Sequence, residues 1–299
     1  MEIKSAAHSQ HHQLRLDEQK DIRRKLYKKI GLAIVYILLG LWAVFTFVPL
    51  LWMLSSSFKD SSSITAVPPE LIPSRPTLDA YIRIFTVGGL GRWFLNSVIV
   101  AGVSTVINIF FASLAGYAFS KLKFPGRNQI FWVLLSSMMI PGQVTLIPLY
   151  ILVVNTLQLE NTYIGLIVPG MVAVGSIFLM KQFMSSLPSS LIDAGRIDGC
   201  SEFGIFWKII LPMSKPGLAV LGIFTFVAHW NNFFWPFLIT NTNSMRTLQV
   251  GLTSFRFENM QDYGAMMAGA VCSAVPMIIV FLALQKYFLR GITIGAVKG

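Results

Sequence analysis

The sequence has few charged residues and almost no cysteine. Only 12% of its 299 residues are Asp, Glu, Lys or Arg, whereas 54% are hydrophobic. A water-soluble core could not enclose that much apolar surface, so the composition places the chain in a membrane. The two cysteines, Cys200 and Cys272, have no metal-type spacing and form no disulfide framework.

Several chemical motifs are also missing. There is no G-x-x-x-x-G-K-[ST] phosphate loop, no Ser/His/Asp or Cys/His constellation, and no Asp or Glu inside any long apolar run. We therefore expect a protein that is not an enzyme, with no catalytic residue, metal or cofactor of its own. His8, His11 and His12 could bind a metal, but they lie in a polar tail without the fixed geometry that a site needs. The net charge of +11 could suggest nucleic acid, yet the basic residues lie mainly between and outside the apolar runs.

Six long uncharged runs are present. Backbone groups that face lipid must be hydrogen-bonded within their own segment, and the runs lack the alternation of barrel strands, so we expect helices. The predicted fold class is an all-α polytopic membrane protein with six transmembrane helices, at 30–58, 93–120, 128–159, 161–180, 216–245 and 263–285.

The distribution of Lys and Arg predicts the orientation. Counted over alternate segments, one side of the membrane holds eighteen and the other six. By the positive-inside rule the richer side is cytoplasmic, which puts both termini there. The inner segments are then 1–29, 121–127, 181–215 and 286–299, and the outer ones 59–92, 155–162 and 246–262.

Five parts follow along the chain. Residues 1–29 are predicted to be a mostly disordered cytoplasmic tail, and four prolines make 59–92 an extracytoplasmic segment of irregular chain and short helix. The five predicted parts are the tail 1–29, the first transmembrane helix 30–58, the outer segment 59–92, a core of five helices at 93–289 and a cytoplasmic tail at 290–299. Within the core, Pro141 and Pro276 interrupt spans three and six, as hinges or as fixed kinks.

The loop at 189–216 predicts two short helices that break at a glycine. Gly199 suits a left-handed helix end, Ser201 can cap the next helix, and Pro212 should stop it. The second helix places four large apolar side chains on one stripe at i, i+3, i+4 and i+7, namely Phe203, Phe206, Trp207 and Ile210. Such a stripe could enter a groove on a partner, or the helix pair could lie on the lipid surface.

This loop resembles the EAA loop of the membrane subunits of ATP-binding-cassette importers. The family pattern is Glu-Ala-Ala, three residues, Gly, nine residues and Ile-x-Leu-Pro, and the spacing here is intact. Gly195 replaces an Ala, which should loosen that turn by under about 1 kcal/mol. Stretches such as VPLLWMLSSSFKD, HWNNFFWPFLIT and LRGITIGAVKG are similar to the carbohydrate-uptake, maltose-type branch, and the likeness covers nearly everything after residue 40.

The resemblance implies a permease subunit that translocates a sugar or oligosaccharide by alternating access. Its loop would dock into a cytoplasmic ATPase, and ATP and Mg would be bound by that partner. The implied partners are a second homologous permease, two ATPase subunits, an extracytoplasmic solute-binding protein and membrane lipid, with no nucleic acid. The docking residues implied by the match are Asp193, Ala194, Gly195, Asp198, Gly199, Phe203, Phe206, Ile209, Leu211 and Pro212.

A polar cluster inside span five is the predicted substrate pathway. It consists of His229, Trp230, Asn231 and Asn232, whose amides and imidazole cost free energy in hydrocarbon unless they face a cavity or a neighbouring helix. Aromatic faces and amides suit a sugar, but interhelical packing is the alternative. A glycerol phosphodiester or polyamine importer remains an alternative function, as does an ion-coupled secondary transporter.

Overall fold

A computed structural model describes residues 2–258 and 262–296, and every regular element in these ranges is a helix. This confirms the all-α prediction. Three helices are each long and apolar enough to cross a membrane, and the number of spans rises to six if each of three bent helix pairs counts as one. The chain divides into two units, Met1–Ser55 and Ser56–Gly299.

The first unit consists of one helix. α1, Glu2–Ser56, is continuous, so the predicted disorder of residues 1–29 is wrong for the described residues. The physical reason is that the chain has no Gly or Pro between Glu2 and Ile30 and is rich in residues with high helix propensity. The side chains of His8, His11 and His12 lie outside the part of the chain whose side chains are described.

The predicted irregular segment 59–92 is confirmed as irregular chain with short helices. These helices are α2, Ser61–Ile64, α3, Asp79–Arg83, and the π-helix η1, Ile84–Gly88. Between α2 and α3 no helix forms, since prolines that lack an N–H recur there.

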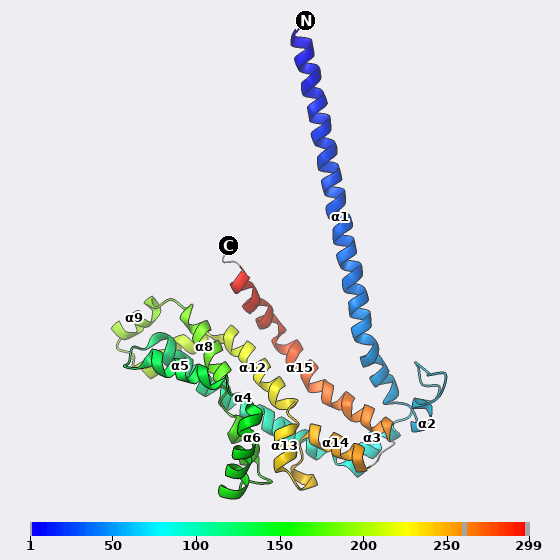
Figure 1. The fold of residues 1–299 in the computed structure, drawn as a ribbon, viewed down its shortest axis with the longest axis vertical. Helices are drawn as coiled ribbons and strands as arrows, with labels where there is room; N and C mark the ends of the chain where they lie inside the picture. The colour runs from blue at the N-terminus through cyan, green and yellow to red at the C-terminus, as the bar shows by residue number, and fades with distance from the viewer. Residues whose placement is uncertain (1, 259–261, 297–299) are drawn as a thin grey trace. The chain divides into compact units, whose positions relative to one another are not determined.

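Helix α4, Leu90–Lys121, is the central helix of the second unit (Figure 1). It packs against α8, Val174–Ser185, and α12, Lys215–Trp230, and α12 packs in turn against α15, Tyr263–Ala296. Small residues allow the close approach of α4 and α8: a Cβ at Gly116 would lie only 2.7 Å from the Cβ of Met180.

Two of the predicted spans are bent rather than straight. α5, Arg127–Ser137, is followed after Pro141 by α6, Gly142–Tyr150, and the π-helix η2, Ile151–Thr156, with a bend of 88°. The predicted break at Pro141 is therefore confirmed. The second pair, bent by 50°, joins α8 to the short helices α7, Tyr163–Ile167, and η3, Val168–Gly170.

The last third of the chain also differs from the simple spans. The predicted span 216–245 consists of α12 and α13, Phe234–Ile239, with residues 231–233 between them. Pro276 lies inside α15 without interrupting it, and α15 continues to Ala296, so residues 290–296 are not a separate tail. The connecting elements are η5, Asn243–Met245, and α14, Leu248–Glu258.

Candidate functional site

The predicted docking loop begins with α9, Ser190–Ile197, and breaks at a glycine. Gly199 has a φ of 77°, in the left-handed region that favours glycine. The amide of Gly199 donates to the carbonyl of Arg196 at 3.1 Å, and the amide of Cys200 donates to the carbonyl of Gly195 at 2.9 Å. These two bonds form a Schellman motif, so the predicted break is confirmed.

The second helix of the loop starts where Ser201 was predicted to cap it. The Ser201 hydroxyl accepts a hydrogen bond from the amide of Gly204 at 3.1 Å and begins α10, Glu202–Ile205. The helix continues through the π-helix η4, Phe206–Ile210, and α11, Leu211–Met213.

The prediction that Pro212 stops this helix is wrong. Pro212 lies in the first turn of α11, the chain turns only at Ser214, and α12 starts at an angle of 79° to the loop helix. The amide of Leu211 bonds to the carbonyl of Phe206, which is a π-type bond. Because the α-helical register changes just before the proline, its ring sits at a helix start, where a missing N–H costs little.

The four-residue apolar stripe is divided between the inside and the outside. Phe206 and Ile210 are fully buried in a core that includes Tyr117 and Met180. Phe203 and Trp207 remain 56% and 45% exposed, and their rings contact each other at 6.1 Å between centroids. The prediction of one outward stripe is therefore wrong, since the loop helix must also bury a face against its own chain.

The other predicted docking residues differ in their exposure to solvent. Gly195 is buried, and Ile209 and Leu211 are partly exposed. Ile197, at the end of α9, is 86% exposed and is a large apolar residue that the sequence motif did not single out. The remaining predicted residues are all exposed: Asp193, Ala194, Asp198, Gly199 and Pro212.

Gly195 is a packing residue. A Cβ at this position would lie 2.9 Å from Cδ1 of Ile209 and 3.2 Å from Cγ1 of Ile205. The prediction that glycine merely loosens the helix is therefore incomplete, because the missing side chain also lets the two loop helices approach.

A hydrogen-bonded network connects the loop to α4. Nε of Arg196 lies 2.7 Å from Oε1 of Glu202, and its Nη1 lies 3.3 Å from Oδ1 of Asp193. The hydroxyl of Tyr117, on α4, lies 2.6 Å from the other carboxylate oxygen of Glu202. Glu202 was not predicted from the sequence, although an acidic residue in the first turn of a helix is a usual signal of a helix start.

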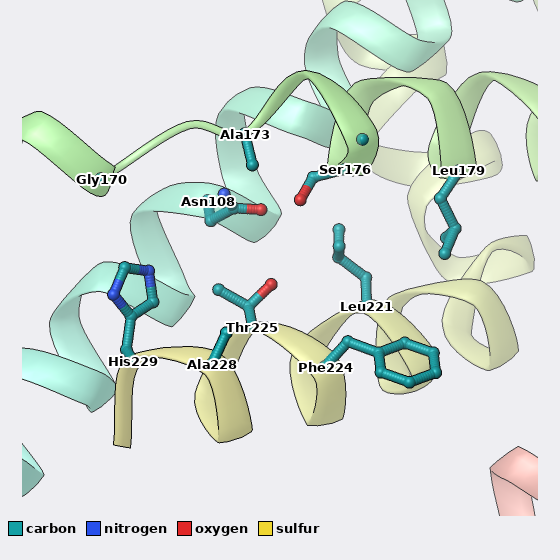
Figure 2. Close-up of a pocket in the computed structure, with 11 residues that line it drawn as sticks. Asn108, Gly170, Ala173, Ser176, Leu179, Leu221, Phe224, Thr225, Ala228 and His229 are labelled. Atoms are coloured by element: carbon teal, nitrogen blue, oxygen red, sulfur yellow. The ribbon is translucent and has the colours of Figure 1, made fainter. Parts of the chain in front are cut away.

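A second candidate site is a pocket of about 280 Å³ between α4, α8 and α12. Figure 2 shows the side chains of Asn108, Ser176 and Thr225 directed into a common space, with the imidazole of His229 at one end. The eleven lining residues include no carboxylate, ammonium or guanidinium group. The pocket is therefore suited to an uncharged molecule that can form hydrogen bonds.

Asn108 contributes a buried amide to this pocket. It is only 1% exposed, and its Oδ1 has no hydrogen-bond partner among the described residues. A buried amide oxygen without a partner is costly, so a polar group of a bound molecule that reached it would lower that cost. The ring of His229 is held against Gly170, where a Cβ would lie 3.1 Å from its Cε1.

Only one of the four residues predicted for the substrate pathway lines this pocket. Successive helical side chains point about 100° apart at 3.6 residues per turn, so Trp230 cannot share the direction of His229. Trp230 is buried, donates to the carbonyl of Ser273 at 3.1 Å and stacks on Phe226 at 5.7 Å.

The packing alternative therefore holds for Trp230, and its predicted place in the pathway is corrected. Asn231 and Asn232 follow the end of α12, and neither lines the pocket. Three polar residues of the pocket were not predicted from the sequence, namely Asn108, Ser176 and Thr225. Thr225 precedes His229 by four residues, so its helical spacing could have identified it.

The described helices thus carry two candidate sites, the loop at 189–216 and the pocket between α4, α8 and α12. Residues 108–294, more than half of the chain, match the family model described as "Binding-protein-dependent transport system inner membrane component". The chain belongs to this family of inner-membrane transport components. Its relatives are named as permeases of ABC transporters.

Individual relatives support the same membership. The chain is 42% identical over 254 residues to the Arabinooligosaccharides transport system permease protein AraQ of Halalkalibacterium halodurans, covering 84% of this chain and 91% of the relative. It is 32% identical over 265 residues to the sn-glycerol-3-phosphate transport system permease protein UgpE of Yersinia pestis, covering 86% and 94%. A bacterial ABC transporter involved in alginate import has the same fold, with a TM-score of 0.78 at 24% identity over 87% of this chain and 97% of that one.

Proposed function

We propose that this chain is the permease subunit of an ATP-driven importer for an uncharged sugar or oligosaccharide. The observation that carries the proposal is the pocket of Asn108, Ser176, Thr225 and His229, which offers an amide, two hydroxyls and an imidazole but no ionic group. Such groups match sugar hydroxyls, and the relative from Halalkalibacterium is named for arabinooligosaccharides. At about 280 Å³ the pocket is near the lower limit for small-molecule sites, so one sugar ring would occupy it at a time.

Energy would come from partner subunits. In this proposal the loop at 189–216 docks on a cytoplasmic ATPase through exposed residues such as Phe203, Trp207 and Ile197. One chain supplies one loop, so two ATPase subunits, which bind ATP and Mg, require a second homologous permease. By the positive-inside rule both termini and the loop would be cytoplasmic. This places the loop on the side where ATP is bound.

On the outer side, the solute-binding protein would meet the segment 59–92 and residues 246–262. A loaded binding protein and ATP would together open the pocket outward, and hydrolysis would then open it inward, so that access alternates.

The relative from Yersinia favours a second candidate, import of a glycerol phosphate ester. An anionic solute calls for Arg or Lys in the pocket, and a polyamine calls for carboxylates, and the lining residues include neither. An ion-coupled mechanism is disfavoured as well, since it calls for carboxylates within the spans, and the residues that line the pocket include none.

Uptake assays test the proposal. Cells that express the complete importer are given labelled arabinooligosaccharides or labelled sn-glycerol-3-phosphate, and ATP-dependent accumulation is measured. We expect accumulation of the sugar alone, and about a tenfold loss in Thr225→Val, which removes a hydroxyl at constant shape. Thr46→Val, an exposed position on α1, is the matched control. Accumulation of glycerol phosphate, or equal uptake by both variants, would contradict the proposal.

A further inference from the structure

The carboxylate of Glu202 is shared by three structural elements. One oxygen accepts from Arg196 of α9 at 2.7 Å, and the other lies 2.6 Å from the hydroxyl of Tyr117 on α4. Glu202 is itself the first residue of α10. The carboxylate thus joins both helices of the docking loop to one long helix of the membrane core.

Burial shields the Tyr117 side of this connection from water. Tyr117 is 2% exposed, and its ring lies 5.7 Å from the ring of Phe206, which is fully buried. A hydrogen bond to an ionised acceptor is stronger than a neutral one, particularly when one partner is shielded from water. The loop and α4 are therefore expected to move together at this point.

The same helix reaches the pocket lined by Asn108. Nine residues separate Asn108 from Tyr117, which corresponds to about 14 Å along α4 at 1.5 Å per residue. A shift of the loop that acts on Tyr117 would therefore be carried along a stiff helix to the buried amide of Asn108.

We infer that Tyr117 and Glu202 are a positioning pair, through which movement of the docking loop is transmitted along α4 to the pocket. Neither residue touches the solute. The inference rests on the proposed function, because it assumes that the loop is moved by an ATPase.

The first test measures solute transported per ATP hydrolysed by the complete importer in proteoliposomes, with labelled arabinooligosaccharides as the probe. Tyr117→Phe removes the hydroxyl and keeps the ring, and Glu202→Gln removes the charge and keeps the shape. We expect each variant to lower the ratio about fivefold or more while ATP is still hydrolysed. The double variant should be no worse than the worse single variant, because both changes break one connection.

Tyr163→Phe is the matched control. It removes a hydroxyl that lies 2.7 Å from Oδ1 of Asn96, a residue near the opposite end of α4. The ratio should be unchanged in this variant. An unchanged ratio in Tyr117→Phe, equal losses in both phenylalanine variants, or additive losses in the double variant would overturn the inference. If Tyr117→Phe does not assemble, Glu202→Gln alone decides by the same criterion.

A second test does not depend on the identity of the solute. In a chain whose native cysteines are replaced by serine, Asn108→Cys reports the accessibility of the pocket through its rate of alkylation. We expect ATP to change this rate severalfold, and Tyr117→Phe to abolish most of that change. An equal response to ATP with and without the Tyr117 hydroxyl would overturn the inference. If the Asn108→Cys chain responds to ATP while the wild-type importer accumulates no sugar, that result would instead count against the proposed solute.

Discussion

Arg83 and Asp262 are 179 residues apart in the sequence and form a bidentate ion pair. Nε of Arg83 lies 2.7 Å from one carboxylate oxygen of Asp262, and its Nη2 lies 3.0 Å from the other. This hydrogen-bonded pairing raises the pKa of the Arg83 guanidinium. Because Arg83 ends α3 and Asp262 precedes α15, the pair connects the irregular segment 59–92 to the last long helix.

The first prediction separates the two roles of Asp262, which also caps α15 by accepting from the amide of Ala265 at 3.0 Å. Asp262→Asn keeps an acceptor for the cap and loses the charge, so we expect a destabilisation of about 1 kcal/mol or less. Asp262→Ala loses both, which should cost about 1 kcal/mol more. Thermal unfolding of the purified protein measures the difference, and equal melting temperatures for the two variants would show that the cap contributes nothing.

The second prediction concerns Gly251 on α14. A Cβ there would lie 2.1 Å from Cδ2 of Trp93, whose ring is almost fully buried. Gly251→Ala should therefore destabilise the protein by about 1–3 kcal/mol through overpacking. Gly102→Ala on α4, where a Cβ would meet nothing within 4 Å, is the matched control and should be neutral or slightly stabilising. Similar melting temperatures for both variants would contradict the close packing of α14 on α4.

The third prediction tests the backbone at Gly199. A β-branched residue in the left-handed region costs about 1–2 kcal/mol, and space is not limiting, since a Cβ there would meet nothing within 4 Å. Gly199→Val should leave membrane insertion normal, weaken co-purification with the ATPase and reduce uptake severalfold. Asn tolerates this conformation better, so Gly199→Asn should retain most of both properties. If the Val variant matches wild type in co-purification and uptake, the loop does not couple the subunits.

The fourth prediction compares Asn108, which lines the pocket, with Trp230, which is packed in the core. Asn108→Leu removes the amide and should lower sugar uptake by about tenfold or more with assembly intact, because the proposed polar contact to the solute would be lost. Trp230→Ala instead removes a buried ring and should destabilise the protein by about 3–5 kcal/mol. Uptake and co-purification of the second permease are measured on the same membranes. Assembly lost in the Asn108 variant but kept in the Trp230 variant would reverse the two assignments.

Local chemistry made much of the structure of the loop at 189–216 predictable. The left-handed Gly199 and the Ser201 cap depend on backbone conformations that only a few residue types favour, so each was correctly placed from the sequence. The break at Pro141 was predictable for the same reason. Composition likewise determined the membrane class, because the chain is too apolar to hide its side chains from water.

Tertiary contacts decided which side chains are available for binding. Helical spacing puts Phe206 and Trp207 in one apolar set, but only the packing of the loop against Tyr117 and Met180 buries the first and leaves the second accessible. The pocket likewise draws Asn108, Ser176 and Thr225 from three helices that are distant in the sequence. A sequence determines local backbone preference and the period of each helix, whereas the face that each helix buries depends on which other helix packs against it.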